Sequence, residues 1–170
     1  MAKPLQDQFI KLYDDLSDAI FRHCYFRVFE KERAKELMQE VFIKTWEYMK
    51  KGGRIDNPKA FLYKAANNIV IDESRKKKAM SLDVLQEAGF DPPDATQERL
   101  LKLLEGGELI RLLKHLEPKH REAITMKYVD DLDIGEIAEA TGETANNITV
   151  RIHRGLEKIR DILKENGTEI

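Results

Sequence analysis

The sequence predicts an all-α fold of two small helical domains joined by a linker, and three observations support this prediction. Apolar residues recur at helical spacing in every long segment, whereas alternating β-branched runs bounded by turn residues are nearly absent. Residues 79–108 carry glycines, adjacent prolines and scattered acids that interrupt the apolar pattern. At 170 residues with 42% hydrophobic content, the chain can form one medium core or two small ones. We therefore expect domains at 1–78 and 109–170, separated by an acidic linker at 79–108.

Two helices are expected before the first pair of adjacent glycines. The first covers residues 6–29. The second begins near residue 32 and ends at Gly52-Gly53. The buried face of the first helix is expected to hold Phe9, Leu12, Leu16 and Ile20. That of the second is expected to hold Leu37, Met38, Val41, Phe42, Thr45, Tyr48 and Met49. The single cysteine, Cys24, lies on the first helix and is expected to be a buried core thiol, so no intramolecular disulfide can form.

A third helix is expected to begin at Pro58 and to run to about residue 78, because Asn57 is a natural N-cap and proline suits the first helical position. Its expected buried stripe is Phe61, Ala65 and Ile69. Four polar residues follow along another side at i, i+4, i+8 and i+11, namely Lys64, Asn68, Asp72 and Arg75. Aromatic rings that could stack unpaired bases are nearby in sequence: Trp46, Phe61 and Tyr63. This stripe could bind nucleic acid or be an ordinary solvated face.

The second domain ends in the pattern of a helix-turn-helix. An apolar helix at 109–116 is broken by Pro118, and a further helix passes through 123–126. A short helix with Ile134, Ile137 and Ala138 on one stripe is then closed by Gly142, which tolerates left-handed geometry. Thr144 can cap the next helix, whose apolar residues are expected to share one buried face: Ile148, Ile152, Leu156, Ile159 and Leu163.

The rest of this last helix carries side chains suited to the major groove of DNA. They hydrogen-bond base edges or neutralise phosphates: Asn146, Asn147, Thr149, Arg151, His153, Arg154 and Lys158. The net charge of −2 is low for a DNA-binding protein, but the charge is segregated along the chain. Residues 59–78 hold six basic side chains against two acidic ones, and residues 146–164 hold five against two. Both candidate helices are therefore locally positive, and duplex DNA is the expected ligand, with a plain helical hairpin as the alternative.

Several function classes are excluded by missing motifs. The sequence has no phosphate-binding glycine loop, HExxH, CxxC or nucleophile elbow, so we expect no enzyme and no cofactor. His23, His115 and His120 have no acids or cysteines at metal-ligand spacing, so they are expected to be structural or solvent-facing, and no metal site is expected. No apolar run approaches the roughly 18 residues that span a bilayer, and the beginning of the chain lacks a signal-peptide stretch. We expect a cytoplasmic protein without membrane insertion.

Three separated segments also occur in a particular order: ELMQEVFIKTWEYM at 36–49, FLYKAANNIVIDESRKK at 61–77 and EIAEATGETANNITVRIHRGLEKIR at 136–160. In this order they resemble the polymerase-docking helix, the promoter-melting helix and the upstream-element reader of the extracytoplasmic-function (group IV) sigma factors of bacterial RNA polymerase. The segment 116–132 is similar to the family's lead-in to that reader, with Arg121 where the family usually places arginine. Gly155 stands where the family often has alanine, at a helix cost of about 1 kcal/mol.

The resemblance implies a promoter-specificity subunit that directs the polymerase core to promoters and helps to open the minus-ten element. It implies a polymerase-binding face of Glu36, Gln39, Glu40, Ile43 and Glu47. The melted non-template strand at the minus-ten element would contact Arg54, Asn57, Lys64, Asn68, Asp72 and Arg75. The minus-thirty-five duplex would contact Thr144, Asn146, Asn147, Thr149, Arg151, His153, Arg154 and Lys158. The resemblance also allows an anti-sigma protein as a partner.

Two other functions stay open on the residues alone. One is an independent helix-turn-helix regulator with a helical partner-binding or ligand-binding domain, which would footprint its operator without polymerase. The other is a helical adaptor with no DNA role, which would show no salt-sensitive affinity for nucleic acid.

Overall fold

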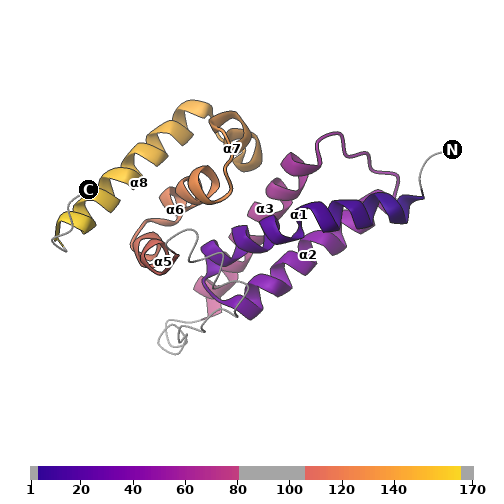
Figure 1. The fold of residues 1–170 in the computed structure, drawn as a ribbon, viewed down its shortest axis with the longest axis horizontal. Coiled ribbons are helices and arrows are strands. Elements are labelled where there is room, and N and C mark those ends of the chain that lie inside the picture. The colour runs from indigo at the N-terminus through magenta and orange to yellow at the C-terminus, as the bar shows by residue number, and fades with distance from the viewer. Residues whose placement is uncertain (1–3, 81–105, 166–170) are drawn as a thin grey trace. The chain divides into compact units, whose positions relative to one another are not determined.

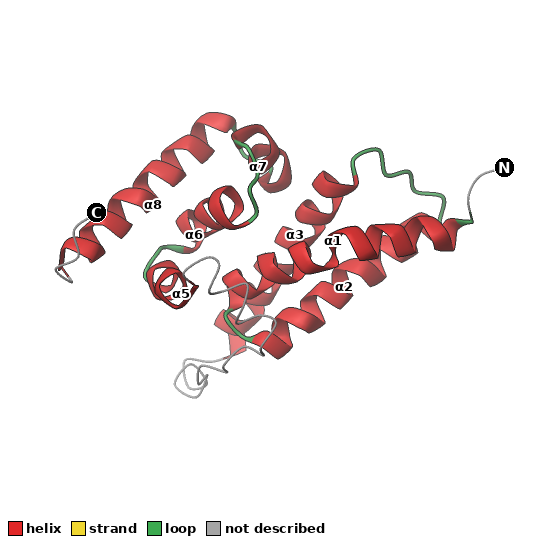
Figure 2. Ribbon diagram, in the orientation of Figure 1, coloured by secondary structure: helices red, strands yellow, loops and turns green. Residues whose placement is uncertain are grey.

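The regular structure is helical throughout residues 4–80 and 106–165, which are the residues that the computed structural model describes (Figures 1 and 2). The predicted all-α fold is confirmed, and no strand occurs in these two ranges. The chain divides into two compact units, Met1–Asp91 and Pro92–Ile170. Most of the linker expected at 79–108 lies outside the described residues, and its last three residues, 106–108, already belong to a helix. The linker boundaries therefore stay a prediction.

The first unit is a bundle of three long helices, α1 (Leu5–Val28), α2 (Lys31–Lys50) and α3 (Pro58–Met80), each packed against the other two. Helix α1 ends because Phe29 adopts left-handed geometry with φ 61°. The expected core of α2 is confirmed except at Tyr48, which is 42% exposed. Cys24 is fully buried, as predicted.

Partly buried polar side chains join the helices of this bundle at the edge of the core. Nε and Nη2 of Arg33 on α2 donate to the two carboxylate oxygens of Glu73 on α3, the Nε–Oε1 distance being 2.7 Å. Arg27 Nη1 donates to the side-chain oxygen of Asn67 at 2.8 Å. Since Glu73 and Asn67 are buried, these bonds fix how α3 is rotated against α1 and α2.

The buried face of α3 differs from the predicted stripe. Phe61 and Ala65 are only partly buried, while Ile69 is buried as expected. The residues in the interior are Leu62, Tyr63, Ala66, Asn67, Ile69, Val70 and Glu73. The apolar run at the start of α3 is wide enough to accept either rotation, and the polar bonds to Arg27 and Arg33 favour the observed one.

The second unit contains α5 (Gly106–Lys114), α6 (Pro118–Ile124), a π-helical turn η2 (Thr125–Val129), α7 (Ile134–Thr141) and α8 (Ala145–Glu165). The break at Pro118 is confirmed, because α6 begins there. Arg121 on α6 donates to three carbonyls at and just after the end of α5, those of Leu113, Lys114 and Leu116, at 2.8, 3.2 and 3.1 Å. The arginine that the resemblance singled out therefore holds the end of α5 to α6.

Helix α8 packs on α6 and α7 through a face slightly rotated from the predicted one. Ile148 and Ile152 are buried as expected, while Gly155 and Ile162 lie inside. The other three predicted members of this face are only partly buried: Leu156, Ile159 and Leu163. A Cβ added to Gly155 would lie 2.7 Å from Cγ1 of Ile124 on α6. The glycine thus allows α8 and α6 to cross closely, which rotates the face toward positions 155 and 162.

Among the described residues, no helix has both the length and the apolar character needed to cross a membrane. The same residues contain no group of three or more histidine, cysteine, aspartate or glutamate side chains placed to hold a metal ion.

Candidate nucleic-acid and polymerase interfaces

The turn between α7 and α8 is built as the sequence predicts. Asp133 and Glu136 form a reciprocal capping box at the start of α7, and Gly142 ends this helix in left-handed geometry with φ 73°. Thr144 Oγ1 accepts a hydrogen bond from the backbone N–H of Asn147 at 3.1 Å, which makes it the cap of α8. The short helix, turn and long helix therefore form a defined helix-turn-helix.

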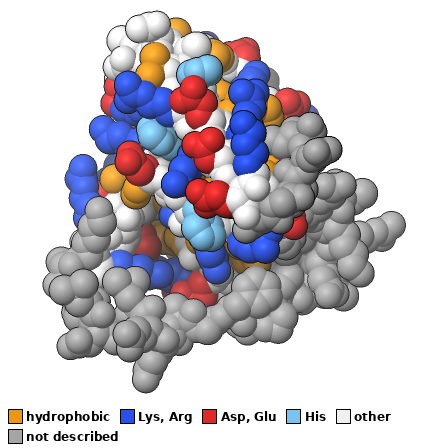
Figure 3. Space-filling model, turned by 90° about the vertical axis from the view of Figure 1, so that its left-hand side faces the viewer, with side chains coloured by type: hydrophobic (Ala, Val, Ile, Leu, Met, Phe, Trp, Pro, Cys, Tyr) orange, Lys and Arg blue, Asp and Glu red, His pale blue; other side chains and the backbone are white. Residues whose placement is uncertain are grey.

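The outer face of α8 exposes most of the residues predicted to contact DNA. They are Thr144, Asn146, Asn147, Thr149, His153, Arg154 and Lys158. The hydroxyl of Thr149 donates to the Ala145 carbonyl at 2.9 Å. The imidazole of His153, 69% exposed, lies 3.3 Å from a carboxylate oxygen of Glu157. Figure 3 shows Lys and Arg side chains interleaved with acids and histidines on the face it draws.

Arg151 differs from the rest of the predicted set, because its side chain is only 14% exposed. Its guanidinium lies 3.0 Å from a carboxylate oxygen of Glu143 in the turn and 3.9 Å from one of Glu122 on α6. The hydrogen bond from the Asn147 amide, and to a smaller extent that from Arg151, hold the pKa of the Glu143 carboxyl below its ordinary value. Arg151 is therefore committed to two carboxylates within the unit.

The four-residue stripe predicted on α3 faces solvent as a set: Lys64, Asn68, Asp72 and Arg75. In the loop before α3, Arg54 forms an exposed ion pair with Asp56 at 3.0 Å. Asn57 is exposed and its side-chain oxygen accepts from the Ala60 N–H at 3.2 Å, which confirms the predicted N-cap. All six residues predicted for the minus-ten element are thus accessible from solvent.

Of the aromatic rings predicted to stack bases, Tyr63 is unsuitable because it is 2% exposed and packs edge-on against His23. Tyr48, which the sequence pattern placed in the core, is the ring that reaches the loop. It packs against Phe61 in a tilted arrangement with centroids 5.0 Å apart, its hydroxyl donates to the Arg54 carbonyl at 3.3 Å, and its ring covers Gly53. Its position as the last aromatic residue before Gly52-Gly53 was the one signal that could have placed it at the loop.

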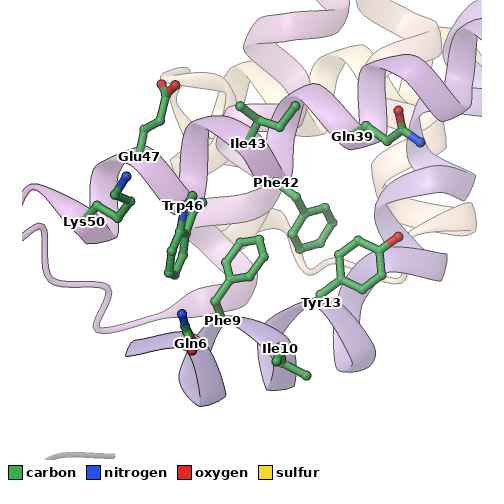
Figure 4. Close-up of a pocket in the computed structure, with 10 residues that line it drawn as sticks. All are labelled: Gln6, Phe9, Ile10, Tyr13, Gln39, Phe42, Ile43, Trp46, Glu47 and Lys50. Carbon is green, nitrogen blue, oxygen red and sulfur yellow. The ribbon is translucent and has the colours of Figure 1, made fainter. Parts of the chain in front are cut away.

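The predicted polymerase-binding face of α2 is largely exposed, with Ile43 at 58%. Glu36 pairs with Arg33 at 2.6 Å, and Glu40 pairs with Lys44 at 3.5 Å. Three members of this face, Gln39, Ile43 and Glu47, also border an open hollow of about 600 Å³ between α1 and α2. Figure 4 shows the rings that line this hollow, among them Phe9, Phe42 and Trp46, turned toward one another between the two helices.

Comparisons with known proteins match both units to one family. The family described as "Sigma-70 region 2" matches residues 12–80, and the family described as "Sigma-70, region 4" matches residues 106–159. The chain is 28% identical to the ECF RNA polymerase sigma factor SigW of Bacillus subtilis, over 94% of this chain and 91% of that protein. It is 25% identical to SigX of the same organism, over 95% and 88%.

A solved structure has the same fold. The sigma factor RpoE from Bartonella quintana, crystallised with the anti-sigma factor NepR, matches with a TM-score of 0.70 at 18% identity, over 92% of this chain and 97% of that one.

Proposed function

The chain belongs to the extracytoplasmic-function sigma factors of bacterial RNA polymerase, and from this premise we propose how its two units divide the recognition of a promoter. As a sigma factor it directs the polymerase to promoters and is not an enzyme. Because both units match the family, the alternative of an independent regulator with a separate sensing domain has no support. We place the protein in the cytoplasm, where bacterial polymerase works.

The second unit binds the minus-thirty-five element through α8. Its exposed polar residues lie along the outer face of a capped helix-turn-helix, the geometry that brings a recognition helix into the major groove. Asn146, Asn147 and Thr149, near the start of α8, are the residues nearest base edges. Arg154 and Lys158, further along, neutralise phosphates.

The first unit captures an unpaired base of the minus-ten element between α3 and the loop before it. Removing a base from a duplex costs a few kcal/mol, which stacking and hydrogen bonds in a pocket can offset. Asn68 and Asp72 supply the hydrogen bonds, while Lys64 and Arg75 at either end of the stripe hold phosphates. The partly exposed rings of Tyr48 and Phe61 form the stacking surface beside the loop.

The polymerase core binds the outer face of α2. This face is largely exposed, and the hollow beside it between α1 and α2 has a mainly apolar lining that includes four aromatic rings. An apolar side chain of the partner can therefore be buried next to polar contacts. An anti-sigma protein is a second proposed partner, supported by the solved relative that was crystallised with one.

The observation that carries this proposal is the exposure of six minus-ten residues in one unit and a capped recognition helix in the other, each unit matching its own sigma region. The test mixes the chain with bacterial core polymerase and a genomic promoter library and then sequences transcript starts. New starts that share two spaced elements are expected. No association with core and no new starts would overturn the proposal.

A variant separates binding from opening. Asp72→Ala should leave duplex binding by the polymerase complex within about twofold while lowering permanganate reactivity of thymines in the minus-ten element, because Asp72 contacts only the melted strand. Asp14→Ala removes an equally exposed acid from α1 and serves as the matched control. Equal loss of binding and opening in Asp72→Ala would contradict the proposed division between the units.

A further inference from the structure

Four side chains of the second unit form a continuous chain of contacts from α6 to the recognition helix. Glu122 on α6, 8% exposed, faces Arg151 Nη1 at 3.9 Å. Arg151 Nη2 lies 3.0 Å from Oε1 of Glu143, and Oε2 of Glu143 accepts a hydrogen bond from Nδ2 of Asn147 at 3.2 Å. Asn147 is exposed at the start of α8. These contacts therefore connect a buried carboxylate on α6 to an exposed amide on the face of α8 that is proposed to bind DNA.

The contact with Glu143 dictates which end of the Asn147 amide faces inward. An ionised carboxylate only accepts hydrogen bonds, so the NH2 end must be directed to Glu143. The guanidinium of Arg151 holds the other carboxylate oxygen of Glu143, which restrains the carboxylate itself. Asn147 then has two groups left for a ligand, its side-chain oxygen as an acceptor and its second N–H as a donor.

This remaining pair matches one base edge in the major groove. Adenine presents N6–H as a donor and N7 as an acceptor, which pair with the oxygen and the second N–H of a held asparagine. Guanine presents two acceptors, N7 and O6, so the asparagine oxygen would face another oxygen. A held amide can donate its second N–H to only one guanine acceptor, so guanine receives one hydrogen bond where adenine receives two. An amide that turned over would lose its match to adenine and lose nothing toward guanine, so holding the amide favours adenine.

We propose that Glu143 is a positioning residue that, braced by Arg151, makes Asn147 select adenine over guanine at one position of the minus-thirty-five element. This inference rests on the proposed function of α8 and adds the base that α8 selects. Arg151 thereby changes role from the predicted DNA contact to the brace of the turn.

The test uses the full chain with core polymerase and a promoter library randomised across the minus-thirty-five element, with bound promoters sequenced. For the wild type, one position should favour adenine over guanine. Asn147→Ala should reduce that preference by roughly fivefold or more, since a bidentate base contact is lost. Glu143→Gln should reduce it at the same position, because glutamine can donate as well as accept and so frees the amide to turn. Replacing that adenine with 7-deaza-adenine should weaken wild-type binding but not binding by Asn147→Ala.

Glu139→Gln is the matched control, because it removes one exposed negative charge from α7 next to the turn. It should leave the preference unchanged. Arg151→Lys keeps the charge but loses the two-pronged guanidinium, and it should weaken the preference at the same position while thermal unfolding reports whether the unit stays folded.

Four outcomes would overturn the inference. An unchanged adenine preference in Glu143→Gln, with promoters still selected, refutes it and leaves the proposed function standing. A uniform loss of binding to all promoters refutes it in favour of a purely structural network. A shift at a different position, toward or away from cytosine, shows that Glu143 reads a base directly. If the wild type selects no promoter, the proposed function fails and the inference fails with it.

Discussion

Replacing Gly155 by alanine should destabilise the second unit, although alanine favours helices. In an unconstrained helix, this change stabilises by about 1 kcal/mol. Here the new Cβ would lie 2.7 Å from Cγ1 and 3.1 Å from Cδ1 of Ile124, which is 1% exposed, and 3.7 Å from Cβ of His120. Cγ1 is held close to the α6 backbone, so the helices must separate. Overpacking of this kind costs about 1–3 kcal/mol, and the net expected loss is about 1 kcal/mol.

Urea unfolding of the full chain, read with hydrogen exchange at amides of α6 and α8, measures this change within the unit concerned. The decisive comparison is a double-mutant cycle with Ile124→Ala, which removes the clashing atoms. In that background Gly155→Ala should become stabilising, because only its helix preference remains. Stabilisation by Gly155→Ala in the wild-type background would refute the steric argument, as would the same effect in both backgrounds.

Three further changes probe the other contacts. Glu73→Gln should destabilise the first unit by about 2 kcal/mol through loss of the charged hydrogen bonds from Arg33. Hydrogen bonding from Arg33 lowers the pKa of the Glu73 carboxyl in the folded protein. The stabilisation is therefore complete above the ordinary carboxyl pKa, and it is lost as the pH falls through the lowered pKa of the folded state. Unfolding curves of wild type and variant should converge in acid. Arg154→Ala should reduce the salt slope of promoter binding by about 1, whereas a variant with an unchanged slope would show that this side chain holds no phosphate. Gly53→Ala places a Cβ too close to the ring of Tyr48, so the ring must leave its place over the loop or the loop must shift. Strand opening at the minus-ten element should then fall, while binding to core in a pull-down is retained.

Local signals predicted the helix ends well. Asn57 and Pro58 start α3, and Gly142 ends α7, as the sequence indicates, because caps and left-handed turns depend on residues only a few positions apart. The rotation of each helix was harder to predict. On α8 the apolar pattern includes both Leu156 and Ile162, and the choice between them follows from the close approach of α6 at a glycine.

In the candidate site, too, features set by local spacing were predictable and features set by packing between helices were not. Lys64 and Asp72 were correctly predicted to be exposed, since their spacing alone places them on one outer side of α3. Arg151 was predicted on the exposed polar face of α8, but it is mostly buried, because its partner Glu122 comes from another helix. A periodic pattern contains no information on such pairs, which form only when the helices pack.

The pairing of Arg151 with two carboxylates also bears on how strongly α8 can bind DNA by itself. With Arg151 paired, the exposed cations among the residues predicted to contact the minus-thirty-five element are Arg154 and Lys158. The imidazole of His153 lies against the carboxylate of Glu157. Two phosphate contacts give a salt slope of only about −1.8, far from that of a strong autonomous DNA binder. With a net charge of −2, the free chain gains little from long-range attraction to DNA. We infer that tight binding arises only when the polymerase holds both units at once, since each contact then raises the effective concentration of the other.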